Sequence, residues 1–509
     1  MIYFLMLDKY KQHRKRKLLR KIMEEFYKLV KKTRLEKADK LSSSVGADIY
    51  LKREDLQDVH SFKIRGAYCK MLQLTADEKK AGVIAASAGN HAQGVALSAK
   101  KLGISATIVM PKTTPDIKVE AVKGFGASVV LYGDNYSEAQ EKCNELIRTS
   151  GMTFVHPFDD DLVIEGQGTI ANEILSELDR VTHIFVPVGG GGMLAGIAQV
   201  VKELKPRVKV IAVEPVDSNA MQASIKANKR VELNHVGIFA DGVAVKKVGE
   251  KTFAIARELV DDFITVTIDE ICAGIKSIFE DTRSVVEPAG ALGVAGVKKY
   301  KLPEDAVAVA ICSGANMSFE RLQFIAERTL VGSKKEALYS VELPEKAGAL
   351  RKFCREVINN HSITEFNYRL KARNKAHFFV GVNVSDESDK ENLEQRMLTH
   401  GFRFVDLTED DSAKEHVRHM IGGFSPEAND EVFYNINFPE RPRALQDFLN
   451  AIGSSYNISL FHYRGLGGDT GRVMIGFECD NPKNLENIFK SINYEAEKVR
   501  SKTVELFLK

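Results

Sequence analysis

One lysine in this chain of 509 residues has neighbours that suit covalent chemistry. Lys63 lies within Ser61–Ala67, directly after the aromatic residue Phe62 and near a predicted helix start. Loss of water around an ammonium group lowers its pKa, and a neutral lysine amine forms Schiff bases with carbonyl compounds. By composition alone, a lysine on the surface remains the simpler interpretation.

Three segments rich in glycine or serine follow predicted buried strands. Ligands of open parallel sheets gather at the carboxyl ends of the strands, so the three segments together indicate one binding site. Ser87–His91 opens a helix whose first amides and dipole favour an anion such as a carboxylate. Gly189–Gly192, followed by Met193, can wrap closely round a phosphate because glycine has no Cβ atom. Cys312–Asn316 contains Ser313, whose hydroxyl can form a hydrogen bond with a ring nitrogen.

Each of these three segments has a simpler interpretation when it is taken alone. The first and the third could be ordinary turns with a capping residue, and the glycine run could be a flexible loop. The glycine run is not a Walker loop, because no Gly-Lys-Ser/Thr follows it, and it does not fit GxGxxG. The three segments together therefore indicate a binding site more strongly than any one of them does alone.

The elements that must position these segments alternate between strand and helix from about residue 50 to 328. Buried apolar runs separated by helical segments predict parallel sheets covered on both faces, which is an α/β fold. The expected strands are Val83–Ala86, Ser105–Met110, Ser128–Tyr132, Thr153–Val155, Ile184–Val188, Val208–Val213, Phe263–Val266 and Ala306–Ile311. The expected helices include His91–Leu102, Tyr136–Thr149, Gly168–Leu178 and Leu194–Leu204.

The rest of the chain contains an internal duplication. Residues 343–369 and 438–464 align without a gap, with nine identities in 27 positions. Each copy has the order strand, helix, strand, strand, helix with a possible final strand, which predicts a ferredoxin-like βαββαβ unit. A structural or oligomerisation module is the simplest interpretation of such a tail.

Composition and charge limit the class of protein. Lys and Arg number 72 and Asp and Glu number 69, a near balance that argues against a dedicated nucleic-acid binder. Residues 1–37 nevertheless hold 13 basic and 4 acidic side chains, and residues 13–31 have the pattern of a basic amphipathic helix. We expect this helix to dock on the body of the protein, with membrane-surface binding as the alternative. The six cysteines are scattered without a CxxC pair, which indicates reduced thiols and a cytoplasmic location.

Two further features could suggest a membrane or a metal. Ile184–Val201 lacks charge over 18 residues, but Pro187 and four consecutive glycines are poor helix material, so we expect strand, loop and helix. His416 and His419 have HxxH spacing without a surrounding cluster of carboxylates or thiols, which favours a solvated helical face. The sequence therefore predicts neither a membrane span nor a metal site.

Taken together and in this order, Ser61–Ala67, Ser87–His91, the tetraglycine run and the late Ser-Gly-Ala-Asn resemble the fold-type II pyridoxal-phosphate enzymes. Within them, about residues 30–509 are most similar to the biosynthetic threonine dehydratases (threonine ammonia-lyases). The resemblance implies elimination of water from L-threonine to give 2-oxobutanoate and ammonia, the first step of isoleucine biosynthesis. It also implies pyridoxal 5'-phosphate as the cofactor, isoleucine and valine as opposing effectors, and a homotetramer.

The resemblance implies a role for each motif residue. Lys63 would form the Schiff base with the cofactor and, once freed, would remove the Cα proton, and Phe62 would lie against the pyridine ring. Asn90 would bind the 3-hydroxyl and Ser313 the ring nitrogen, giving a mild electron sink that suits β-elimination. The phosphate would be held by the backbone amides of Gly189, Gly190, Gly191, Gly192 and Met193. The substrate carboxylate would be received by Ser87, Ala88, Gly89, Asn90 and His91. Effector contacts are expected at Tyr368, Arg369, Tyr463 and Arg464.

The expected architecture is a two-lobed α/β catalytic unit with parallel-rich sheets, followed by two ferredoxin-like (ACT-like) α+β regulatory subdomains. The expected bounds are 1–32 for the basic extension, 33–330 for the catalytic domain with a smaller lobe at about 75–160, and 337–410 and 431–509 for the two subdomains.

Other members of the same fold are the alternatives. Serine racemases have a second serine in the Ser-x-Gly-Asn-His motif, where this chain has Ala88. Racemases and some catabolic dehydratases also bind a metal after the tetraglycine helix, but here only Glu214 fits and Ala220 stands where a carboxylate is expected. Arg34 also stands where the family shows proline. A serine/threonine dehydratase or racemase, or a non-catalytic amino-acid sensor, remains the alternative.

Overall fold

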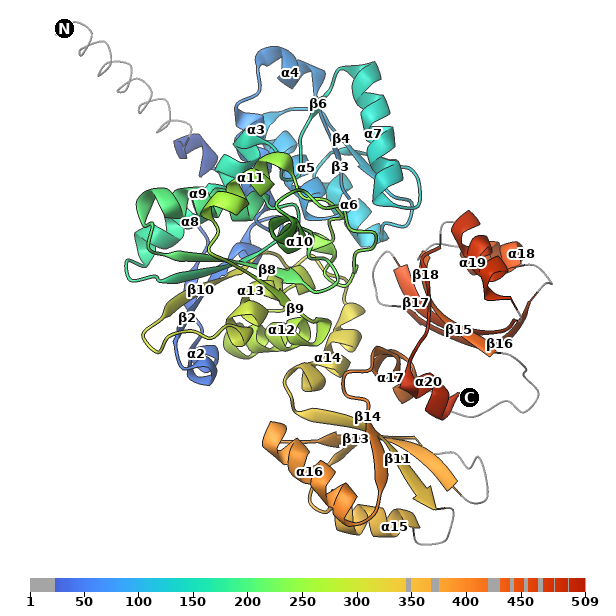
Figure 1. The fold of residues 1–509 in the computed structure, drawn as a ribbon. Helices are drawn as coiled ribbons and strands as arrows, with labels where there is room; N and C mark the ends of the chain where they lie inside the picture. The colour runs from blue at the N-terminus through green and yellow to red at the C-terminus, as the bar shows by residue number, and fades with distance from the viewer. Residues whose placement is uncertain are drawn as a thin grey trace, which may run out of the picture. The chain divides into compact units, whose positions relative to one another are not determined.

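The computed structural model of the chain divides into two compact units, Met1–Met317 and Ser318–Lys509, which are described separately (Figure 1). The structure describes residues 23–344, 349–367, 375–419, 431–439, 444–452, 456–465, 470–479, 481–492 and 494–508.

The first unit is built on two sheets that are parallel apart from one edge strand. The larger sheet has the order β1-β2-β10-β7-β8-β9, and only the pair of β1 with β2 is antiparallel. The smaller sheet has the order β5-β4-β3-β6 and all of its pairs are parallel. The strands are β1 (Leu35–Lys37), β2 (Asp48–Arg53), β3 (Val83–Ala86), β4 (Ala106–Met110), β5 (Ser128–Leu131), β6 (Thr153–Phe154), β7 (His183–Pro187), β8 (Lys209–Pro215), β9 (Asp262–Val266) and β10 (Val307–Cys312).

Helices connect these strands, and strands such as β7 and β10 are buried along their whole length. Apolar side chains from β7, β8, β10 and the neighbouring helices form one core, and β3 and β4 form a second core with their own helices. The helices are α2 (Asp39–Val45), α3 (Lys63–Leu72), α4 (Ala76–Ala81), α5 (Asn90–Leu102), α6 (Asp116–Gly124), α7 (Tyr136–Ser150), α8 (Asp161–Glu177), α9 (Gly192–Leu204), α10 (Ala220–Ala227), α11 (Glu250–Leu259), α12 (Ile268–Thr282) and α13 (Pro288–Lys299).

The eight expected strands are confirmed within two residues at each end. The helix expected from Gly168 is wrong at its start, because α8 begins at Asp161, where the Asp160 carboxylate accepts the amides of Leu162 and Val163. The first two turns of α8 contain Gly166, at which a side chain would overlap the backbone of α3. A glycine in a helix weakens the helical pattern, but here it permits close packing of two helices.

The N-terminal segment docks on the first unit where the structure describes it. Phe26 and Val30 are buried against Ile64 and Tyr68 of α3. Residues 13–22 of the helix expected over 13–31 lie outside the described residues. The expected end at residue 31 is wrong, because the helix ends at Phe26 and a turn follows.

The second unit contains two antiparallel sheets of the same topology. Their orders are β12-β13-β11-β14 and β16-β17-β15-β18, which is the ferredoxin-like order expected from the duplication. Each copy also has a register shift at the matching position, at Ile363/Glu365 and Ile458/Leu460. The strands are β11 (Glu336–Pro344), β12 (Ile363–Asn367), β13 (Lys375–Asn383), β14 (Arg403–Asp406), β15 (Glu431–Pro439), β16 (Asn457–Gly465), β17 (Thr470–Glu478) and β18 (Ala496–Lys498). The helices are α14 (Arg321–Gly332), α15 (Ala349–Phe353), α16 (Glu387–Thr399), α17 (Asp411–Glu415), α18 (Ala444–Ile452), α19 (Pro482–Ser491) and α20 (Lys502–Phe507).

The expected solvated face around His416 is wrong. His416 is buried, and its Nδ1 atom lies 2.9 Å from Nδ1 of His462 on β16. The neighbouring Ala413 and Val417 pack into the apolar cluster of this unit and carry His416 inward with them.

Candidate active site

Lys63 is the first residue of α3, and the chain just before it pairs with the segment that follows β10. The amide of Phe62 donates to the carbonyl of Ser313 at 3.1 Å, and Ser61 forms an isolated antiparallel bridge with Gly314. Two of the motifs found in the sequence, 251 positions apart, are therefore joined by backbone hydrogen bonds.

The surroundings of the Lys63 amine favour its neutral form. Its Nζ atom donates to the carbonyl of Pro157 at 3.0 Å and lies 5.3 Å from the centre of the Phe62 ring. Burial lowers the pKa of the Lys63 amine to about 8, and the negative charge of Glu287 opposes part of this shift. A much larger fraction of the amine is therefore neutral at physiological pH than for a lysine in water.

Asn90, the first residue of α5, joins a third motif to the same place. Asn316 Nδ2 donates to Asn90 Oδ1 at 2.6 Å, and Asn90 Nδ2 donates to Glu287 Oε1 at 2.7 Å. The two helices approach closely, because a Cβ atom on Gly94 of α5 would lie 3.1 Å from the carbonyl carbon of Lys63.

The segment Ser87–His91 carries no charged side chain. His91 is buried, and its Nε2 atom lies 2.7 Å from the carbonyl oxygen of Val155. Burial lowers the pKa of the His91 imidazole to about 3, so the ring is neutral at physiological pH and donates to this carbonyl. Gly89 donates its amide to Ser87 Oγ at 3.2 Å, and Ala88 has no ionisable group.

The tetraglycine run forms the turn between β7 and α9. Gly191 has φ of 94° and is the N-cap of α9, so no capping side chain covers the first amides of that helix. A side chain on Gly190 would overlap the ring of Phe158, which follows Pro157, the acceptor for Lys63. These amides, at the positive end of a 13-residue helix, can hold an anion such as a phosphate.

Contacts around this turn fix its conformation. Thr252 Oγ1 donates to the carbonyl of Gly190 at 2.7 Å. Met193 is 4% exposed and packs in the core of the larger sheet, so it can offer a ligand only its backbone amide. Ser313 is also buried, and its hydroxyl donates to the carbonyl of Ala289 at 3.3 Å.

Glu287 is a site residue that the sequence motifs did not reveal. It is 2% exposed and is the N-cap residue of α13, but its carboxylate does not cap that helix. The only local feature of the sequence that marks Glu287 is its position before Pro288. A carboxylate followed by proline is typical of many helix starts and does not indicate a functional site. Only the fold places its side chain beside Asn90.

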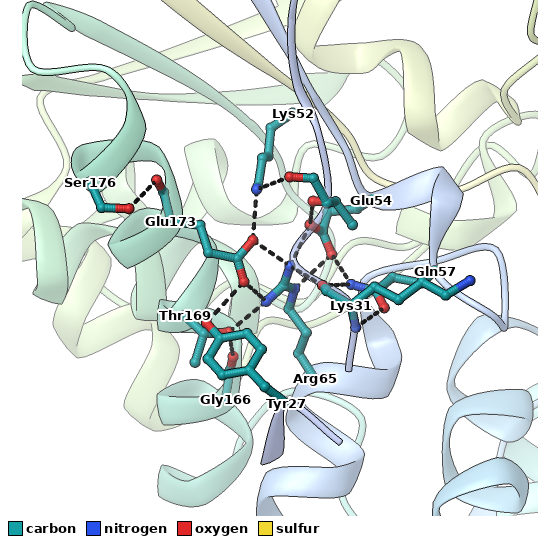
Figure 2. A network of polar contacts seen from close by, with 11 residues as sticks. Tyr27, Lys31, Lys52, Glu54, Gln57, Arg65, Gly166, Thr169, Glu173 and Ser176 are labelled. Carbon is teal, nitrogen blue, oxygen red and sulfur yellow. Dashed lines mark hydrogen bonds and ion pairs between the residues drawn. The ribbon is translucent and has the colours of Figure 1, made fainter. Parts of the chain in front are cut away.

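A second group of charged side chains surrounds Arg65 of α3 (Figure 2). Arg65 is fully buried between Glu54 and Glu173, and it donates two hydrogen bonds of 2.7–2.9 Å to each carboxylate. Lys52 Nζ also donates to Glu173 at 2.6 Å, as does the Tyr27 hydroxyl at 3.0 Å. The nearby charge of Arg65 holds the pKa of Glu54 below its usual value although burial opposes this.

The carboxylate of Glu214 forms hydrogen bonds with the backbone of the chain. Its two carboxylate oxygens accept the amides of Met221 and Gln222 at 2.8 and 2.7 Å, at the start of α10. Burial raises the pKa of Glu214 to about 8. Among the described residues, no group of three or more His, Cys, Asp or Glu side chains could hold a metal ion.

The expected effector residues are only partly within the described chain. Tyr463 and Arg464 lie on β16, where they are paired in register with Val473 and Arg472 of β17. Tyr368 and Arg369 lie outside the described residues.

Two protein families match the chain, one for each unit. Residues 27–314 match the family described as "Pyridoxal-phosphate dependent enzyme". Residues 327–417 and 423–507 match the family described as "C-terminal regulatory domain of Threonine dehydratase". In the part of the chain that the structure describes, no helix has the length and apolar character needed to cross a membrane.

Individual relatives agree with these matches. The chain is 48% identical to "L-threonine dehydratase biosynthetic IlvA" of Burkholderia multivorans over 476 residues, which are 92% of this chain and 94% of the relative. Among solved structures, threonine deaminase isoform 2 of Solanum lycopersicum is 46% identical with a TM-score of 0.58, covering 60% of this chain and 84% of that one. Maize serine racemase is 30% identical with a TM-score of 0.57, covering 61% and 97%.

Proposed function

This chain belongs to the pyridoxal-phosphate-dependent enzymes and, among them, to the biosynthetic threonine dehydratases, and from this membership we propose a role for each residue of its site. The enzyme removes water from L-threonine and gives 2-oxobutanoate and ammonia in isoleucine biosynthesis. The observation that carries the residue assignment is that hydrogen bonds join the segments of these residues. The amide of Phe62, next to Lys63, donates to the carbonyl of Ser313, and Asn316 of the same late segment donates to Asn90.

The residues present fit pyridoxal phosphate. Substitution of Gly190 or Gly191 would place a Cβ atom against Phe158, Met221 and Thr252, so this turn is shaped by its neighbours into a cradle for a phosphate. The amine of Lys63 has a lowered pKa, as attack on a carbonyl requires. When bound, pyridoxal phosphate supplies an electron sink for the charge that develops at the substrate Cα.

The side chains around that group have separable tasks. Lys63 Nζ accepts the Cα proton, which a neutral amine of low pKa can do at physiological pH. The Ser313 hydroxyl would donate to the ring nitrogen in place of the carbonyl of Ala289, without giving up its proton, and Asn90 Nδ2 would donate to the 3-oxygen. The first amides of α9 bind the phosphate, and Phe62 packs against the ring.

The substrate carboxylate binds at the N-terminus of α5, to the backbone of Ser87–His91. His91 is neutral, and its imidazole is held by Val155, so the backbone and the helix dipole supply the attraction. Ala88 has no proton to give at the face where a racemase needs an acid, which favours elimination over racemisation.

The second unit regulates the first. We infer that isoleucine binds there and inhibits, that valine opposes it, and that Tyr368, Arg369, Tyr463 and Arg464 contribute contacts or signalling. The match of residues 327–417 and 423–507 to a regulatory domain supports this proposal. We further propose a cytoplasmic homotetramer, with the extension at 1–32, the catalytic domain at 33–330 and the subdomains at 337–410 and 431–509. Sedimentation of the purified chain tests the tetramer.

The experiment that tests the residue assignment is turnover of L-threonine by Lys63→Ala. We expect no measurable 2-oxobutanoate, because this variant lacks the amine that binds the cofactor and takes the Cα proton. Lys70→Ala, a change on the same helix, is the matched control and should retain turnover. Substantial dehydration by Lys63→Ala would overturn the assignment.

A further inference from the structure

The side chain of Asn90 is held from both ends of its amide. Asn316 Nδ2 donates to Asn90 Oδ1 at 2.6 Å, and Glu287 Oε1 accepts from Asn90 Nδ2 at 2.7 Å. Asn316 is itself anchored, because the same Nδ2 donates to the carbonyl of Val59 at 2.7 Å. The three side chains come from the start of α5, the start of α13 and the loop after β10.

This arrangement determines which way the Asn90 amide faces. A carboxylate only accepts hydrogen bonds, so the nitrogen of Asn90 must face Glu287. The NH₂ group of Asn316 only donates, so the oxygen of Asn90 must face Asn316. The amide therefore has one orientation that satisfies both neighbours, and one N–H of Asn90 remains for a ligand.

Glu287 is built into this position. It is 2% exposed, and its own amide donates to the carbonyl of Gly314 at 3.1 Å. Its Oε1 atom occupies space left by two glycines, because a Cβ atom on Gly314 or Gly242 would lie 2.5 or 3.4 Å from it. The carboxylate does not cap α13, so helix capping does not account for it.

Resting on the proposed function, we propose that Glu287 is a positioning residue for the cofactor: it orients the Asn90 amide so that its nitrogen binds the 3-oxygen of pyridoxal phosphate. Asn316 supports the same orientation from the opposite end. Removal of either neighbour allows the amide to rotate and to present its oxygen, which repels an oxygen of the ligand. Cofactor affinity should therefore depend on Glu287 through Asn90.

Titration of the apo-protein with pyridoxal phosphate tests this proposal. The dissociation constant is read from the absorbance of the bound cofactor, and urea unfolding of each apo-protein checks that the fold is intact. Glu287→Gln, which keeps the size of the side chain but can also donate, should weaken binding about ten-fold. Glu280→Gln, a change in a carboxylate that is 44% exposed on α12, is the control and should leave affinity unchanged.

A double-mutant cycle separates positioning from a general structural role. In an Asn90→Ala background, Glu287→Gln should change the dissociation constant by less than about two-fold, because the residue it positions is gone. An undiminished ten-fold effect in that background would overturn the proposal, as would wild-type affinity in Glu287→Gln.

A second variant keeps the proposal testable if Glu287→Gln does not fold. Asn316→Asp places an acceptor against Asn90 Oδ1 and should also weaken cofactor binding, and wild-type affinity in this variant would overturn the proposal. Failure of the wild-type chain to bind pyridoxal phosphate would instead refute the proposed function, so the two failures are distinguishable.

Discussion

Arg65 should be the most costly charged residue to remove from the catalytic unit. Its guanidinium is fully buried and donates two hydrogen bonds to each of Glu54 and Glu173 (Figure 2). Arg65→Leu fills most of the volume but leaves the charge of Glu54 without its main partner. Breaking a buried ion pair in this way costs about 3–5 kcal/mol.

The nature of the interaction also predicts how this cost depends on pH. In the wild type the pKa of Glu54 is lowered by Arg65, so this carboxylate adds stability at neutral pH that is lost as pH falls below about 4.5. In Arg65→Leu, burial without the guanidinium raises the pKa of Glu54, so the variant gains stability as pH falls and the carboxylate becomes protonated. The difference between the two proteins should therefore be largest near pH 7 and should shrink toward pH 4.5.

The assay is hydrogen exchange of the amides of α3 and α8, followed by mass spectrometry at pH 7 and pH 5. Exchange reports local free energies without requiring the two units to unfold together. Lys123→Ala removes the exposed pair with Glu120 and is the control, with an expected cost below about 1 kcal/mol. A loss in Arg65→Leu no larger than in this control, or one that grows as pH falls, would refute the reasoning.

Three further predictions concern the cofactor and regulation. The rate at which pyridoxal phosphate attaches to the apo-protein can be followed by absorbance. This rate should rise with pH and level off near pH 8, because only the neutral Lys63 amine reacts. A rise that continues toward pH 10 would contradict the lowered pKa of Lys63. Gly191→Ala should weaken cofactor binding by at least about ten-fold in an equilibrium titration, because φ is 94° and Met221 and Thr252 leave no room for the methyl group, and wild-type affinity would be inconsistent with this cradle. A chain that ends at Val331 should dehydrate L-threonine without inhibition by isoleucine in a steady-state assay. Inhibition retained by a soluble, active truncation would contradict regulation by the C-terminal subdomains.

The sequence predicts the scaffold because its signals are local. Apolar runs such as Ile184–Val188 are buried in any parallel sheet, and the duplicated pattern of residues 343–369 and 438–464 determines two copies of one topology. The approach of the segment Cys312–Asn316 to Asn90 could be expected because each follows a strand of a parallel sheet.

The partners of these residues could not be predicted, because they come from distant segments. Arg65 pairs with Glu173, 108 positions away, and neither residue lies in a pattern that identifies the other. Glu287 resembles an ordinary helix cap until α13 and α5 are placed together. His416 and His419 have the HxxH spacing of an exposed helical face. Only the three-dimensional packing, in which Val417 enters the apolar cluster, shows that His416 is buried.

The most direct test of the central claim is reduction of the cofactor-loaded protein with borohydride, followed by peptide mapping by mass spectrometry. Reduction makes the bond between the cofactor and its amine permanent. We expect the phosphopyridoxyl mass on the peptide that contains Lys63, and its absence from every other lysine. A label on another lysine, or no label on a protein that binds the cofactor, would contradict the account.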